Sequence, residues 1–192
     1  MPYNLLWRSV EMEVVPLCEQ EDVGILAYSP LMAGLLSGKY TDPAAVPEGR
    51  QRTKHFNHTR TDRCYHEGPG AETETFSALA GIESACDKAG VSMVDGSLGW
   101  LLAQPTVKSL VVGATSPEQM QRNCSQFAVR QPGFPLPSNI SLAADVGCVA
   151  AQAAKALPAS LISELSAATE ELKGVFGAEC DLWQPADQSR YY

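Results

Sequence analysis

Apolar and polar residues follow two kinds of pattern along the first part of the chain. Residues 9–21 have the spacing of an amphipathic helix, with Ser9 as its N-cap. The apolar positions of this helix are Val10, Val14, Leu17 and Cys18. A turn then leads into residues 25–28, a short apolar run typical of a strand that is buried on both faces. The Gly- and Pro-punctuated stretch 29–39 and a long polar loop follow, and a loop of such length indicates function or disorder.

Helical spacing resumes near Glu72 and ends at Gly90, a residue type that commonly follows the last turn of a helix. The apolar stripe of this helix is Phe76, Leu79, Ala80 and Cys86. Ser92 and Asp95 form a capping-box pattern that opens a third helix, which Pro105 stops. The apolar run 107–112 then predicts a second buried strand.

A fourth helix begins directly after this strand. Ser116 is a preferred N-cap, Pro117 fits the first helical position, and Gln119 completes a capping box. Helices and strands therefore alternate, which predicts an α/β architecture with parallel strands.

The pattern becomes less regular in the last third of the chain. Residues 132–137 resemble a linker, and the Ala-rich stretch 141–156 is either a helix or an insertion. A final helix is expected over residues 158–173, with Leu161, Leu165 and Leu172 on one face. We therefore divide the chain into a main unit, a linker with an Ala-rich insertion, and a C-terminal helix with its tail, at residues 1–130, 131–157 and 158–192.

Charge and composition limit the classes of partner. The chain has 22 acidic and 14 basic residues, a formal net charge of −8 and no basic patch, which argues against nucleic-acid binding. No segment reaches the roughly 20 apolar residues of a membrane span, and the N-terminus has no signal-peptide pattern. The six cysteines are irregularly spaced, as in a protein with reduced thiols. We therefore expect a cytoplasmic protein that binds neither nucleic acid nor a membrane.

The ends of the two predicted strands carry the best candidates for chemistry. After the second strand, Gly113 leads into a capped helix, so that free N–H groups and the positive end of the helix dipole suit a phosphate. Thr115 and Ser116 add hydroxyl donors there. After the first strand, Tyr28 could stack on a flat ring while Ser29 binds a phosphate. The ordinary alternatives are a simple capped turn and a tyrosine that covers the core.

Two further patterns are weaker. Residues 34–39 resemble a P-loop, but three residues instead of four separate the glycines and Tyr40 stands where Ser or Thr is required, so we reject this interpretation. A zinc site could use His55, His58, Cys64 and His66. Their spacing fits no standard structural site, and a solvated polar loop is the preferred interpretation.

Three motifs together resemble one known family. They are residues 2–8 (Pro-Tyr-Asn-Leu-Leu-x-Arg), 27–40 (Ala-Tyr-Ser-Pro-Leu-x-x-Gly-Leu-Leu-Ser-Gly-Lys-Tyr) and 112–119 (Val-Gly-Ala-Thr-Ser-Pro-Glu-Gln). In this order they resemble the C-terminal half of an aldo-keto reductase, a (β/α)₈ barrel that binds NADP(H) and reduces aldehydes and ketones. A whole barrel typically needs about 250 residues, and this chain has 192. The resemblance therefore implies an incomplete TIM barrel that holds the end of the sixth strand and strands seven and eight.

The resemblance implies NADP-binding roles for residues after both strands. After the first strand, Tyr28 would stack on the nicotinamide, Ser29, Pro30 and Leu31 would run along the pyrophosphate, and Lys39 would lie near it.

After the second strand, Gly113 and Thr115 match the turn where the adenosine 2′-phosphate sits, and Gln119 and Asn123 match side chains that approach the adenine. Arg122 departs from the family, which commonly has Glu at this position. Arginine cannot accept a hydrogen bond from the adenine amino group, but it could help to bind a 2′-phosphate.

The family's catalytic Asp, Tyr, Lys and His belong to earlier strands, and nothing in this chain matches them. We therefore expect the chain to carry the cofactor half of a carbonyl reductase and to be inactive alone, with the carbonyl substrate belonging to the intact family. Exposed strand edges predict self-association or pairing with another half-barrel. Two alternatives are a non-catalytic regulatory module, like the beta subunits of potassium channels, and a truncated remnant.

Overall fold

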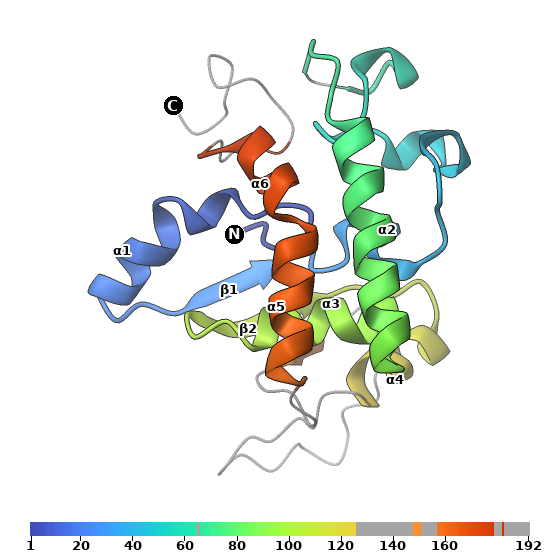
Figure 1. The fold of residues 1–192 in the computed structure, drawn as a ribbon. Coiled ribbons are helices and arrows are strands. Elements are labelled where there is room, and N and C mark those ends of the chain that lie inside the picture. The colour runs from blue at the N-terminus through green and yellow to red at the C-terminus, as the bar shows by residue number, and fades with distance from the viewer. Residues whose placement is uncertain (65, 126–147, 151–156, 179–181, 183–192) are drawn as a thin grey trace.

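The computed structural model describes residues 1–64, 66–125, 148–150, 157–178 and 182. Within these residues the chain forms six α-helices and three strands, joined by several short 3₁₀ helices (Figure 1). The α-helices are α1 (Val14–Gln20), α2 (Glu72–Ala89), α3 (Met93–Leu102), α4 (Pro117–Ser125), α5 (Ala159–Ala168) and α6 (Glu170–Phe176). The strands are β1 (Ile25–Tyr28), β2 (Val107–Val112) and β3 (Cys148–Ala150).

The strands form one mixed sheet in the order β1-β2-β3. β1 and β2 are parallel, as predicted, and their register ends with Tyr28 opposite Val111. β3 is antiparallel to β2. On the far side of β1, the first residues of the chain continue the parallel pairing, since Pro2 bridges to Tyr28 and the Tyr28 N–H donates to the Met1 carbonyl over 2.9 Å.

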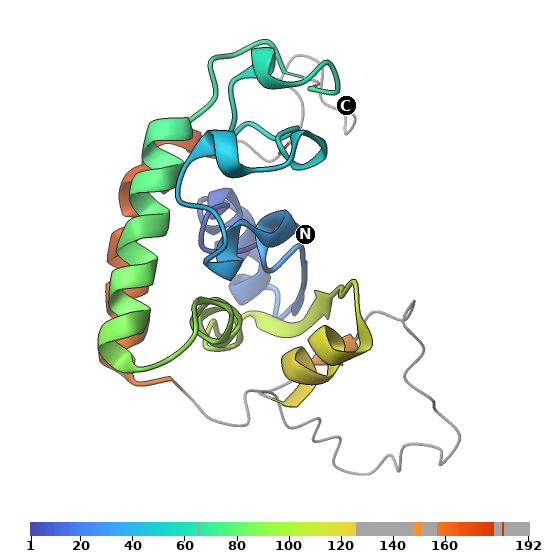
Figure 2. The same cartoon turned by 90° about the vertical axis from the view of Figure 1, so that its right-hand side faces the viewer.

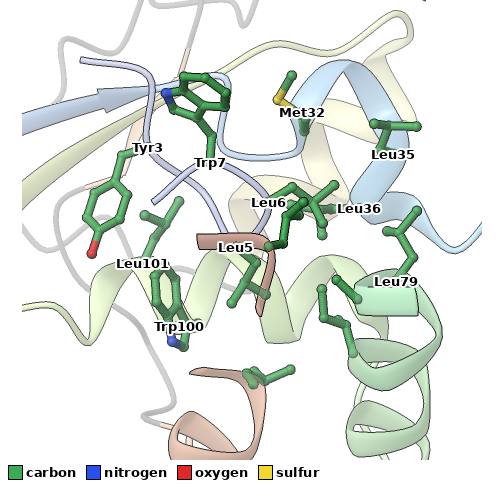
Figure 3. Close-up of a cluster of buried hydrophobic side chains, with 14 of the residues drawn as sticks. Tyr3, Leu5, Leu6, Trp7, Met32, Leu35, Leu36, Leu79, Trp100 and Leu101 are labelled. Carbon is green, nitrogen blue, oxygen red and sulfur yellow. The ribbon is translucent and has the colours of Figure 1, made fainter. Parts of the chain in front are cut away.

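Helices α2, α3, α5 and α6 lie on one side of this sheet. α2 and the α5–α6 pair run side by side in an outer layer, and α3 lies between this layer and the strands (Figure 2). The core between them contains large side chains from the first residues, from α3 and from the stretch after β1, which Figure 3 shows in close-up. Tyr3, Trp7, Phe56, Trp100 and Leu101 are almost completely buried there.

The two faces of β1 differ, contrary to the prediction that this strand is buried on both. Ile25 and Ala27 point into the helical core, whereas Leu26 and Tyr28 are 52% and 38% exposed. Alternate residues of a strand point to opposite faces, so the described residues cover the second face of β1 only in part. Val111, opposite Tyr28 in the register, is half-buried on that face.

A buried polar cluster joins the two ends of the chain. Arg8 donates two hydrogen bonds of 2.8 Å to the carboxylate of Glu11, and others to the Ser166 carbonyl and the Thr169 hydroxyl. Lys173 Nζ lies 2.9 Å from the same carboxylate. The hydrogen bonds from these cations hold the pKa of Glu11 below its usual value against the opposing effect of burial.

The predicted helix boundaries are mostly confirmed. α2 ends at Gly90, whose φ of 65° is left-handed, and the Ser92 hydroxyl accepts the Asp95 N–H over 3.1 Å at the start of α3. The stripe of α2 is partly wrong, because Phe76 is half-buried and Ala80 is exposed. The buried residues of α2 are Thr75, Ala78, Leu79, Ile82, Ala85 and Cys86.

Three expectations need correction. The helix predicted over 9–21 is a 3₁₀ turn at Ser9–Glu11 followed by the short helix α1, so Ser9 is not an N-cap. Leu17 is exposed, because no further layer packs over α1 among the described residues. The final helix is two helices, since the backbone leaves helical geometry at Thr169, although its three leucines are buried as predicted. In the Ala-rich stretch, residues 148–150 form a strand rather than a helix, and the rest of 131–156 lies outside the described residues.

Candidate functional site

Two loops leave the sheet side by side and form the candidate site. Because Tyr28 is opposite Val111 in a parallel pair, the loops after β1 and after β2 start at the same edge of the sheet. In open and closed α/β folds, ligands bind at the carboxyl ends of parallel strands. The structure therefore brings the starts of both predicted loops, at Ser29 and Gly113, to one edge.

The turn after β2 is capped as the sequence predicts. The Gln119 N–H donates to the Ser116 hydroxyl over 3.2 Å, and the side-chain oxygen of Gln119 accepts the N–H and the hydroxyl of Thr115 at 2.8 and 3.0 Å. Gly113 and Thr115 are exposed. The turn thus presents its backbone and the positive end of α4 to solvent, an arrangement that suits an anion.

The same end of α4 favours negative charge on the protein itself. Backbone and Ser116 hydrogen bonds lower the pKa of the exposed Glu118 carboxyl. This is the expected response of an acid in the first turn of a helix.

Asn123 stands out on α4 because its side chain is 5% exposed and its Nδ2 has no hydrogen-bond partner in the part of the chain that the structure describes. Buried amide groups normally have partners, so this nitrogen is an available donor close to the capped turn. Arg122 lies in α4, but its side chain is outside the described residues.

The loop after β1 has an unusual backbone. Ser29, Met32 and Ala33 have φ values of 54°, 45° and 52°, and Gly34 follows at 92°. Left-handed conformations of this kind cost non-glycine residues about 1–2 kcal/mol each, and clusters of them are typical of ligand-binding segments. Asn4 holds the loop in place, because its Nδ2 donates to the Ser29 carbonyl over 3.0 Å.

Arg50 lies against this loop and was missed by the sequence reasoning. A Cβ atom on Gly34 would lie 2.9 Å from Arg50 Nη1, so only glycine lets the guanidinium approach so closely. Arg50 Nη1 also donates to the Tyr40 hydroxyl over 2.9 Å, which orients it. Nothing in the local sequence signals this contact, since sixteen positions separate the two residues.

The other predicted residues after β1 have different environments. Tyr28 reaches the exposed face of the sheet, Pro30 is buried, and Leu31 packs against the core. Lys39 is exposed at the end of the 3₁₀ segment Met32–Ser37 and Gly38. Tyr28 and Lys39 therefore place an aromatic ring and a positive charge at the surface, whereas Pro30 and Leu31 pack the loop against the core.

The histidine-rich loop is packed at His55 and His66, which corrects the prediction of a solvated loop there, whereas His58 is exposed as expected and Cys64 is half-buried. His55 is fully buried, with Nε2 at 2.9 Å from the Leu6 carbonyl and Nδ1 at 3.1 Å from the Thr53 hydroxyl. His66 is also buried, with Nε2 at 3.2 Å from the Thr53 carbonyl. Burial lowers the pKa of His55 to about 4. The described residues contain no group of three or more potential metal ligands.

Comparison with known proteins shows the family of the chain. The model of the aldo/keto reductase family matches residues 1–132, so the chain belongs to this family. Members of the family are oxidoreductases that use nicotinamide cofactors. The chain is also similar to a solved structure, the glycerol dehydrogenase AKR11B4 from Gluconobacter oxydans, with a TM-score of 0.55 at 20% identity, covering 98% of this chain and 44% of that one. This likeness shows the fold.

Two curated relatives illustrate the range of named activities. The chain is 27% identical over 122 residues to a probable voltage-gated potassium channel subunit beta of Arabidopsis thaliana, covering 63% of this chain and 35% of the relative. It is 32% identical over 124 residues to the L-glyceraldehyde 3-phosphate reductase of Escherichia coli O157:H7, covering 63% and 34%. The chain therefore spans about a third of the length of these relatives. No helix in the described part of the chain is long and apolar enough to cross a membrane.

Proposed function

We propose that this chain is the cofactor-binding part of an NADP(H)-dependent carbonyl reductase, in which residues 1–3, β1 and β2 are the end of the sixth strand and the seventh and eighth strands of an incomplete (β/α)₈ barrel. The observation that carries this proposal is the pairing of Tyr28 with Val111, which places a strained loop and a capped helix start at one edge of the sheet.

The side chains at this edge suit a dinucleotide phosphate. Tyr28 would stack on the nicotinamide ring, and the backbone from Ser29 to Leu31 would run along the pyrophosphate. Arg50, which lies against Gly34, and the exposed Lys39 would supply positive charge, and guanidinium groups bind phosphate oxygens through two hydrogen bonds at once. A bound nicotinamide cofactor supplies hydride to a carbonyl carbon.

The residues after β2 suit the other end of the cofactor. The exposed turn at Gly113 and Thr115 and the start of α4 would bind the adenosine 2′-phosphate. The unpartnered Nδ2 of Asn123 would donate to the adenine, with Gln119 beside it. Arg122 would add a charge that only a 2′-phosphate can use.

Calorimetric titration of the full chain with NADPH and with NADH tests this assignment. We expect NADPH to bind more tightly. R50M should weaken both cofactors about tenfold because it removes a charge-assisted contact, whereas the control R63M, which removes an exposed arginine outside the two loops, should weaken neither. R122Q should weaken NADPH alone. Failure of the chain to bind either cofactor would overturn the proposal.

The chain alone should lack steady turnover, because cofactor binding without the acid and the carbonyl pocket supplies orientation but no chemistry. Loss of NADPH absorbance with simple aldehydes as substrates measures this directly. Steady turnover by the purified chain would contradict the assignment of the catalytic groups to residues outside it.

A regulatory role is the second candidate, and the similarity to potassium channel beta subunits favours it. In that role cofactor occupancy would be read by a partner protein in the cytoplasm. Pairing through the open face of the sheet, with another half-barrel or a second copy, fits both candidates, since Leu26 and Tyr28 leave apolar surface exposed there. Co-purification with a channel protein rather than with a reductase half would favour the regulatory role.

A further inference from the structure

β3 is a strand that a barrel of parallel strands does not contain. It runs antiparallel to β2, with Ala150, Val149 and Cys148 opposite Leu110, Val111 and Val112. The barrel of this family is built from parallel strands, so β3 is an addition to it. It comes from the Ala-rich stretch, beyond the residues that match the family model.

β3 covers one of the two edges of the parallel pair. The edge of β1 is already paired with the first residues of the chain, through hydrogen bonds between Tyr28 and both Met1 and Tyr3. The edge of β2 would otherwise present unpaired N–H and C=O groups, which are a template for another strand. β3 pairs with the last three residues of β2, and it lies beside α4 (Figure 2).

The exposed face next to this edge increases the tendency to associate. Leu26 and Tyr28 are exposed on it, and Val111 is half-buried. A strand edge that adjoins an apolar face is a site for pairing with an identical sheet, because both hydrogen bonds and apolar burial are gained. A guard at the edge of β2 reduces the hydrogen-bonded part of that gain, because the outer edge of β3 is only three residues long.

We propose that β3 is an intramolecular guard strand, which occupies the edge of β2 through which the sheet would otherwise pair with a second copy of this chain. Neighbouring strands lie about 4.8 Å apart, so only one strand fits beside residues 110–112 at a time. The guarded state and edge-to-edge pairing therefore exclude each other. β3 has three residues, and its short ladder makes the guard displaceable by a longer strand. The proposal rests on the sheet and not on cofactor binding.

Replacement of the guard by Gly and Ser tests the proposal on the full chain. In the variant C148G/V149S/A150G, low strand propensity should release β3. Amide hydrogen exchange at residues 110–112 should become about tenfold faster, and sedimentation should show a larger average mass at equal protein concentration. The matched control P135G/L136S/P137G changes three residues of the linker-like stretch 132–137 instead of β3 and should behave like the parent in both measurements.

Protection in α2 in the same exchange experiment shows whether the variant is folded. A strengthened guard supplies an independent test that does not endanger the fold. In A150V a β-branched residue faces Leu110 in the register, and exchange at 110–112 should slow. Unchanged exchange in both variants would overturn the pairing. Faster exchange in the Gly/Ser variant without greater association would overturn the guarding role.

Discussion

The two loops of the candidate site reach the same edge of the sheet by different physical means. The turn after β2 is stabilised by its own residues, since Ser116, Gln119 and Thr115 bond to one another within five positions. The loop after β1 contains three non-glycine residues at positive φ and is held by Asn4, which lies 25 positions earlier, and by Arg50, which lies later.

This difference separates local from tertiary determination of structure. A cap forms wherever its few residues occur, so its stability is local and its sequence pattern is diagnostic. A strained loop persists only when its surroundings force it. We therefore expect changes in distant residues to alter the loop after β1 and to leave the turn after β2 intact.

The largest expected effect follows from removing Asn4. Its side-chain oxygen accepts the N–H groups of Leu6 and Trp7 at 2.9 and 3.0 Å, and its nitrogen donates to the Ser29 carbonyl, all in the core. N4A leaves the buried Leu6 N–H without a partner and removes one of the two hydrogen bonds of the Trp7 N–H and of the Ser29 carbonyl. It should therefore lower the free energy of unfolding by on the order of 4 kcal/mol. Urea denaturation measures the loss.

The control for this prediction is N57A. Asn57 also accepts a backbone N–H, from Thr59 at 2.9 Å, but it does so in an exposed loop, so the cost should be about 1 kcal/mol. Equal losses in the two variants would show that the loop after β1 does not depend on its distant contact.

The second prediction concerns pH and the long loop that contains His55. This histidine is neutral in the folded protein because burial lowers its pKa from 6.5 to about 4. The unfolded chain binds a proton there below about pH 6.5, so stability should fall by about 3 kcal/mol as the pH falls from 6.5 to 4 and should change little from this source outside that window. H55Q should remove this part of the pH dependence. Parallel stability curves for parent and variant between pH 7 and 4 would contradict the assignment.

The third prediction isolates the turn after β2. S116A removes the hydroxyl that accepts the Gln119 N–H, and it should cost about 1 kcal/mol. Hydrogen exchange should quicken in the first turn of α4 and stay unchanged in residues 29–38. S160A, at an exposed position early in α5, is the matched control and should cost only a few tenths of a kcal/mol. Faster exchange in the loop after β1 would show that the two loops are coupled.

The smallest predicted effects are two changes in the free energy of unfolding that have opposite signs. Ala33 has a φ of 52° and is exposed, so A33G relieves strain and should stabilise the protein by about 0.5 kcal/mol. Ala114 has no positive φ, so A114G should destabilise by about the same amount through the greater freedom of the unfolded chain. Urea midpoints that move in the same direction for both would remove the distinction between the loops.

Features that are determined locally were predicted from the sequence, whereas features that depend on distant contacts were not. Ser92 and Ser116 correctly predicted the starts of α3 and α4, and Gly90 correctly predicted the end of α2. Both parallel strands were predicted with their observed bounds. These features could be predicted because they depend on neighbours in sequence. The prediction of a strand buried on both faces failed for β1, because the described residues cover its second face only in part.

Within the site, the same rule applies. The residues after both strands were predicted, whereas Arg50 was not, since its contact with Gly34 arises from the path of a long irregular loop. The burial of His55 was likewise missed, because the ring is enclosed by Trp7 and Phe176, which come from opposite ends of the chain. The binding roles themselves remain predictions for titration to decide.

The bonds of Arg8 have a consequence for the order in which the protein forms. Its partners Ser166, Thr169 and Glu170 lie 158, 161 and 162 positions later in the sequence. Such contacts raise the contact order and slow folding, because a long loop must close before the contact is gained. During synthesis the segment around Arg8 therefore reaches its final environment only after α5 and α6, whose contacting residues follow it by at least 158 positions, have left the ribosome.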